Sequence, residues 1–205
     1  MFASRTARTG TVVLVLHGGK AASDAPVRRH HLAYLRMAAV ARRLHRACAT
    51  GDTAVWMLRN RLRGWNESTL DAVVDARWAL DEVERRHPRA QVVLVGHSLG
   101  GRAALRLAGS ARVAAVCALA PWVAADDSPQ HLDGRPALLV HGTRDRVTSP
   151  KASADYVERA GEVNSRVQFA AVRGSGHAML RHKWKWDVLV HRFIGPFAFG
   201  DGRTR

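Results

Sequence analysis

Three residues of this chain have the side chains needed for nucleophilic catalysis: Ser98, Asp145 and His177. A serine hydroxyl is a poor nucleophile near neutral pH, so it needs a base to take its proton. A histidine can take that proton and later return it to a leaving group, while a carboxylate holds the other ring nitrogen. The three residues therefore predict acyl transfer through a covalent intermediate on the serine.

The serine lies in a short glycine-bounded motif, Gly96-His97-Ser98-Leu99-Gly100, of the form G-x-S-x-G. The apolar run 92–95 precedes the motif, and the alanine- and leucine-rich segment 102–108 follows it. A strand, this motif and a helix in sequence predict a nucleophile elbow, a sharp turn that projects the hydroxyl from the edge of a sheet. In such a turn the serine backbone is strained, and the glycines stand where a Cβ would not fit.

The candidate acid and base also follow predicted strands. Asp145 comes shortly after the apolar run 137–140, and His177 comes shortly after the run 166–172 in a glycine-rich loop. The carboxyl ends of parallel strands meet at one edge of a sheet, where the active sites of such folds lie. We therefore expect the acid, the base and the serine to lie close together.

Six other residues compete for these roles, of which His182 and His191 belong to the predicted last helix. Asp126 or Asp127 is an alternative acid, because both follow the preceding predicted strand. His97 and His141 lie beside the predicted site, but neither follows the last predicted strand. Loop position favours the assignment given above.

The motif, its context and the order Ser, Asp, His resemble the α/β-hydrolase superfamily over about residues 11–193. The closest resemblance is to its small, dienelactone-hydrolase-like esterase branch. The turn His17-Gly18-Gly19-Lys20 matches the family's early loop, so the resemblance implies an oxyanion hole formed by the backbone N–H groups of Gly19 and Leu99. Many members insert a lid where this chain has only the 15 residues 122–136, so we expect an open, shallow site.

Apolar and amphipathic segments alternate along the chain. The apolar runs predicted to form strands are residues 11–16, 54–58, 92–95, 113–119, 137–140 and 166–172. This alternation predicts an α/β fold, an open parallel six-stranded sheet with helices on both faces, which is the minimal α/β-hydrolase fold.

The predicted domain organisation is a flexible N-terminal lead-in over residues 1–10, a single domain over 11–195 and a C-terminal tail over 196–205. Ser23 or Asp24, followed by a proline, predicts the start of the first helix.

The chain is strongly basic, with 32 Lys and Arg against 17 Asp and Glu and a net charge of +15. Its arginines are scattered and form no nucleic-acid-binding motif, which argues against nucleic acid as a partner and leaves weak binding to an anionic surface as an alternative. Trp184 and Trp186, which lie among lysines, could contact a membrane, although packing against the sheet is favoured. The first apolar run is too short for a signal-peptide core and no segment has transmembrane length, so a cytoplasmic protein is expected.

These features predict a serine hydrolase that cleaves a small-molecule carboxylic ester with a short or medium acyl chain. No cofactor or metal is expected, and the oligomeric state stays open. The alternatives are an acyltransferase or a peptidase using the same residues, or a non-catalytic binding protein with the hydrolase fold. A complete set of nucleophile, base, acid and oxyanion glycines argues against the last, because a scaffold needs none of them.

Overall fold

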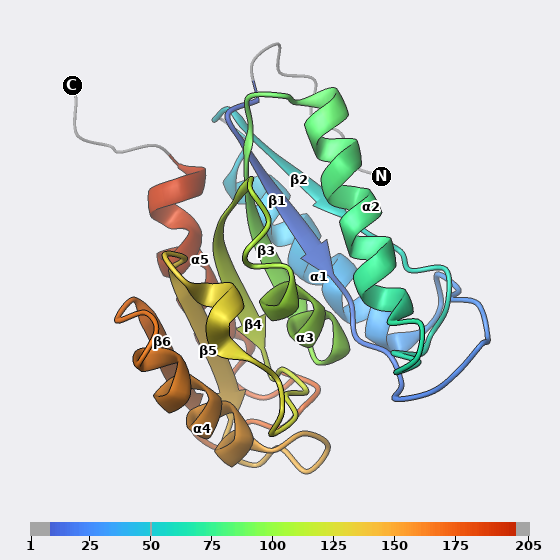
Figure 1. Cartoon of the computed structure of the whole chain (residues 1–205), viewed down its shortest axis with the longest axis vertical. Helices are drawn as coiled ribbons and strands as arrows, with labels where there is room; N and C mark the ends of the chain where they lie inside the picture. The colour runs from blue at the N-terminus through green and yellow to red at the C-terminus, as the bar shows by residue number, and fades with distance from the viewer. Residues whose placement is uncertain (1–8, 50, 200–205) are drawn as a thin grey trace.

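The computed structural model describes residues 9–49 and 51–199, which form a sheet between two layers of helices (Figure 1). The strands are β1 Thr11–Leu16, β2 Thr53–Met57, β3 Gln91–His97, β4 Val113–Leu119, β5 Ala137–Gly142 and β6 Val167–Val172. The helices are α1 Leu32–Ala47, α2 Asp71–Arg86, α3 Leu99–Arg106, α4 Pro150–Gly161 and α5 Lys183–Ala198.

The six strands are all parallel and lie in the order β2-β1-β3-β4-β5-β6, which confirms the predicted fold class. The chain moves outward from β1 to β2 and then crosses to β3 on the other side of β1. Crossovers between parallel strands are right-handed, so helices that connect strands in opposite directions cover opposite faces. This places α2, α3 and α4 on one face and α1 on the other (Figure 1). Helix α5 follows the last strand and packs on the same face as α1.

The core consists of two layers, one on each face of the sheet. Along β1, Leu14 and Leu16 pack under α2 and α3, while Val13 and Val15 pack under α1 and α5. Because both faces are covered, every residue of this strand is buried. The strands therefore have continuous apolar sequences instead of an alternation of apolar and polar residues.

The first helix begins later than the capping pattern predicts. Helix α1 starts at Leu32, and the segment before it pairs instead with the loop after β2. Lys20 forms a bridge with Gly64, and the backbone N–H of Ser23 donates to Oδ1 of Asn66 over 2.9 Å. These long-range bonds replace the local capping bonds on which the prediction of a helix start at Ser23 or Asp24 depended.

The predicted tail over residues 196–205 is corrected at its start, because α5 continues to Ala198. The carbonyl oxygens of Phe197 and Ala198 accept hydrogen bonds from the hydroxyls of Thr11 and Thr53, which tie the last helical turn to the sheet. Phe199 caps this helix. The rest of that tail, residues 200–205, lies outside the described residues, as do residues 1–8 of the predicted lead-in.

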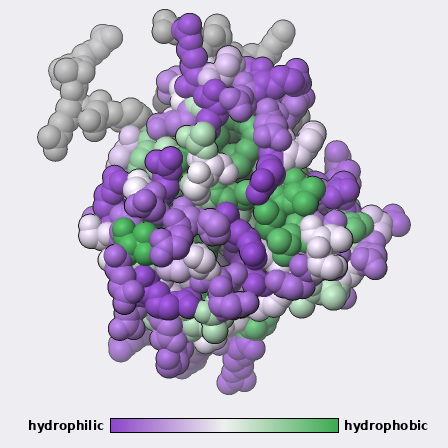
Figure 2. Space-filling model, in the orientation of Figure 1, coloured by the Kyte–Doolittle hydropathy of each residue, from purple (hydrophilic) through white to green (hydrophobic). Residues whose placement is uncertain are grey.

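Most of the surface on the face of α2, α3 and α4 is hydrophilic, in keeping with the basic composition (Figure 2). Hydrophobic residues are also exposed on this face (Figure 2). On α2, Val74 and Trp78 are exposed. On α5, Trp186 is buried and donates its indole N–H to the hydroxyl of Ser175, whereas Trp184 is exposed. Among the described helices, none has the length and apolar character needed to cross a bilayer.

Candidate active site

Ser98 lies in a sharp turn between β3 and α3. Its backbone adopts φ 55° and ψ −120°, a conformation that side-chain-bearing residues rarely adopt. A Cβ at Gly96 would collide with the carbonyl oxygen of Gly100, and a Cβ at Gly100 would lie 2.6 Å from the carbonyl oxygen of His17. The turn therefore requires both glycines of the motif.

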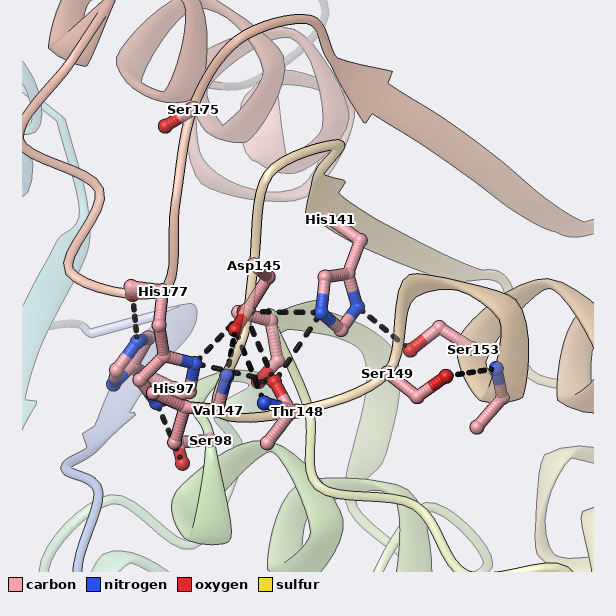
Figure 3. A network of polar contacts seen from close by, with 12 residues as sticks. His97, Ser98, His141, Asp145, Val147, Thr148, Ser149, Ser153, Ser175 and His177 are labelled. Atoms are coloured by element: carbon pink, nitrogen blue, oxygen red, sulfur yellow. Dashed lines mark hydrogen bonds and ion pairs between the residues drawn. The ribbon is translucent and has the colours of Figure 1, made fainter.

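The structure brings Ser98, His177 and Asp145 together at the carboxyl edge of the sheet (Figure 3). Nε2 of His177 lies 3.1 Å from Oγ of Ser98, and Nδ1 lies 2.8 Å from Oδ2 of Asp145. The Asp145 side chain is fully buried and the His177 side chain is 16% exposed. The imidazole thus bridges a buried carboxylate and a hydroxyl at the edge of the surface.

The Asp145 carboxylate accepts hydrogen bonds on both oxygens. Oδ1 accepts from the backbone N–H groups of Val147 at 2.8 Å and Thr148 at 3.0 Å. Oδ2 accepts from His177, from the Thr148 hydroxyl at 3.0 Å and from Nε2 of His141 at 3.1 Å. Burial raises the pKa of Asp145, but these hydrogen bonds outweigh burial and hold the pKa below its ordinary value. The group is therefore ionised at neutral pH.

His141 and Thr148 support this acid, a role that the sequence reasoning did not assign to them. His141 is fully buried, and its Nδ1 accepts a hydrogen bond from the hydroxyl of Ser153 over 2.8 Å (Figure 3). Burial lowers the pKa of His141, so the ring is neutral and donates from Nε2 to Asp145. The Thr148 hydroxyl lies 3.1 Å from Nδ1 of His177 as well. An aspartate followed by a threonine three residues later is the sequence signal that could have indicated this contact.

His97 lies directly behind the candidate base. Its Nε2 donates to the carbonyl oxygen of His177 over 2.9 Å, and the two ring centres are 4.8 Å apart. Burial first, and then the neighbouring His177, lowers the pKa of His97 to about 3. A neutral His97 thus holds the backbone of the loop that carries the candidate base.

The alternative acids do not contact His177. Asp127 accepts hydrogen bonds from Arg102 at 2.8 Å and from the backbone N–H of Ala124 at 2.8 Å. Asp126 is exposed. Within residues 9–49 and 51–199, no group of His, Cys, Asp and Glu side chains is arranged to hold a metal ion.

The loop after β1 lies against the turn that carries the serine. A Cβ at Gly18 would lie 3.2 Å from Cβ of Ser98, and a Cβ at Gly19 would lie 3.1 Å from Cδ1 of Leu99. In the described part of the chain, neither the N–H of Gly19 nor that of Leu99 donates to an acceptor. Leu99 is the first residue of α3, where backbone N–H groups have no partner within the helix.

The connection between β4 and β5 is short. Its one helical segment is a 3₁₀ turn at Pro129–Leu132, and the Leu132 side chain is buried in the core. The segment where lids are inserted therefore packs against the domain itself.

A model of the family described as "Alpha/beta hydrolase family" matches residues 12–137. A serine hydrolase homologue from Coxiella burnetii superposes with a TM-score of 0.69 at 17% identity, covering 94% of this chain and 88% of its own. A serine hydrolase without lid from Xanthomonas campestris gives 0.69 at 17% identity, with 98% and 87% coverage. An esterase from Pyrococcus furiosus gives 0.71 at 14% identity, with 93% and 84% coverage. A search of curated protein sequences finds no match.

Proposed function

The chain belongs to the alpha/beta hydrolase family, and on that premise we propose that it is a serine hydrolase cleaving carboxylic esters with a short or medium acyl chain. Its substrate is a small-molecule ester, and its reaction passes through an acyl-enzyme. Ser98 is the nucleophile, His177 the base and Asp145 the acid.

In the acylation step, Oγ of Ser98 attacks the ester carbonyl carbon while Nε2 of His177 takes the hydroxyl proton. The ionised Asp145 stabilises the resulting imidazolium through its hydrogen bond to Nδ1. When the tetrahedral intermediate collapses, the bond to the alkoxy group breaks and His177 returns the proton to the leaving alcohol. An acyl ester of Ser98 remains.

In the deacylation step, a water molecule takes the place of the alcohol. His177 removes a proton from this water as it attacks the acyl carbon, and then protonates Oγ of Ser98 as the carboxylic acid leaves. The free N–H groups of Gly19 and Leu99 are suited to bind the negative oxygen of both tetrahedral intermediates. The positive end of α3 adds to this stabilisation.

The observation that carries the proposal is the continuous chain of contacts from Oγ of Ser98, through both nitrogens of His177, to Oδ2 of Asp145. A protein that kept the fold only to bind ligands would not need this chain, nor a strained serine at its surface end. The description of a Pyrococcus furiosus neighbour as an esterase supports esters as the substrate class.

The direct test is the turnover of 4-nitrophenyl acetate and butyrate by the purified protein. The protein should hydrolyse both esters, and Ser98→Ala should abolish turnover while leaving the circular dichroism spectrum unchanged. Adding an alcohol or an amine as acceptor separates acyl transfer from hydrolysis, since a transferase forms the new ester or amide in preference to the acid. Equal turnover by the Ser98→Ala protein would refute the proposal.

A further inference from the structure

A cavity of about 310 Å³ opens beside the proposed oxyanion loop. Gly18 and Gly19 form one wall, and the other walls include Tyr34, Arg63, His30 and His31. Its volume lies within the range of small-molecule sites, about 300–1,000 Å³. A group bound in this cavity would therefore lie next to an ester carbonyl held at Gly19.

Arg63 is the charged side chain of this cavity that has no counterion. Nothing in residues 9–49 and 51–199 forms an ion pair or a side-chain hydrogen bond with it, and it is half-buried. Arg61, two residues earlier, is neutralised by Asp75 at 2.5 Å and by Asp71 at 3.4 Å. The same loop therefore presents one paired arginine to α2 and one unpaired arginine to the cavity.

The backbone of Arg63 is held firmly beside the reacting centre. Its N–H donates to the carbonyl oxygen of Ala25 over 2.9 Å, and its own carbonyl accepts from the N–H of Lys20 over 2.8 Å. A Cβ at Gly19 would collide with that same carbonyl oxygen of Arg63. The base of the arginine side chain is thus fixed next to the residue proposed to bind the oxyanion.

The surroundings of the cavity are positive. None of the described residues that line it is an aspartate or a glutamate. Desolvation first, and then the charge of Arg63, lowers the pKa of His31, and the charges of Arg28 and Lys20 act in the same direction. His31 is accordingly neutral at pH 7, and its Nδ1 accepts the backbone N–H of Arg28 over 3.0 Å.

We propose that this cavity binds a carboxylate carried by the ester substrate, with the Arg63 guanidinium as its partner, so that the preferred substrates are acidic esters. The inference rests on the proposed esterase function and adds the substrate class. A guanidinium presents a planar fork of N–H donors that matches a carboxylate in two parallel hydrogen bonds. A positive cleft also raises the local concentration of anionic substrates.

The test compares two pairs of esters of similar size. Monoethyl glutarate against ethyl pentanoate places the charge on the acyl side, and 4-acetoxybenzoate against phenyl acetate places it on the leaving group. In at least one pair, kcat/KM should favour the acidic ester by about 10- to 100-fold, the range expected for hydrogen bonds to a charged group. Arg63→Leu should remove this preference, and Arg63→Lys should keep part of it. Arg77 lies on the exposed face of α2, outside the cavity. Arg77→Leu also removes one positive charge, but it should keep the full preference for the acidic ester.

Calorimetric binding of the same esters to the Ser98→Ala protein separates this inference from the proposed chemistry. Tighter binding of the acidic ester that depends on Arg63 supports the inference even if no ester is turned over. The inference is overturned if both pairs show no preference for the acidic ester, or if Arg63→Leu and Arg77→Leu reduce that preference equally.

Discussion

Asp145→Asn is the substitution whose effect the structure determines most closely. It replaces one carboxylate oxygen with the NH₂ of an amide, which donates hydrogen bonds and cannot accept them. Oδ1 of Asp145 accepts two backbone N–H groups, from Val147 and Thr148. The asparagine oxygen will keep that position, because the backbone donors cannot move away. The amide group must then take the place of Oδ2.

At that place the amide group faces Nδ1 of His177, at the 2.8 Å distance of the present hydrogen bond. Two N–H groups cannot face each other, so His177 will adopt the tautomer whose Nδ1 accepts from the amide. Nε2 then carries the proton and can no longer accept one from Ser98. The expected loss in kcat is about 10³- to 10⁴-fold, or about 4 to 5 kcal/mol of transition-state stabilisation.

The assay is kcat for 4-nitrophenyl acetate, with thermal unfolding of each protein measured alongside. The control is Asp126→Asn, which makes the same chemical change at an exposed residue after the preceding strand and should keep kcat within about twofold of the original, as surface substitutions usually do. If Asp145→Asn stays within about tenfold of the original protein, or if Asp126→Asn or Asp127→Asn loses activity instead with its fold intact, the acid has been assigned to the wrong strand.

Three further predictions concern stability and specificity. His97 has a pKa of about 3 in the fold against about 6.5 when unfolded, so its contribution to stability is complete above pH 6.5 and declines as the pH falls towards 3. Between pH 7 and pH 5, the free energy of unfolding measured in urea should fall by about 2 kcal/mol more in the original protein than in His97→Gln. An equal fall in both proteins would contradict this. Gly96→Ala should abolish activity and lower Tm, whereas Gly161→Ala, with no atom within 4 Å of the added Cβ, should do neither; full activity of the former would disprove the tight turn. Without a lid, kcat/KM for esters from acetate to palmitate should rise by up to about fourfold per methylene only over the first few carbons, with no jump when micelles form. A strong preference for long chains would instead implicate the apolar groove between α1 and α5, which Leu35 and Met179 line.

The fold class and the strand positions could be predicted because strands β1 to β5 are almost entirely buried, which leaves continuous apolar runs in the sequence. The elbow could be predicted equally well, since Gly96, Ser98 and Gly100 lie within one short segment of the chain. A Cβ at Gly96 would collide inside that turn, and a Cβ at Gly100 would collide with the end of β1. The proximity of Asp145 and His177 followed from the parallel sheet, because both come after strands that end at the same edge.

The segment before α1 could not be predicted from local signals. Ser23 and Asp24 have the composition of a helix start, but bonds to residues 62–66, about forty positions away, determine the conformation there. The cavity beside Gly19 and the position of the unpaired Arg63 both arise from this pairing, which no local signal in the sequence specifies. The contact of His141 with Asp145 likewise depends on how a loop closes, which residue spacing does not specify.

The central claim, that Ser98 is the covalent nucleophile, is tested most directly by labelling the purified protein with a fluorophosphonate. We expect the intact protein to gain the mass of one adduct, and peptide mapping to place that adduct on Ser98. The Ser98→Ala protein should gain none. An adduct on another residue, or equal labelling of the Ser98→Ala protein, would contradict the account.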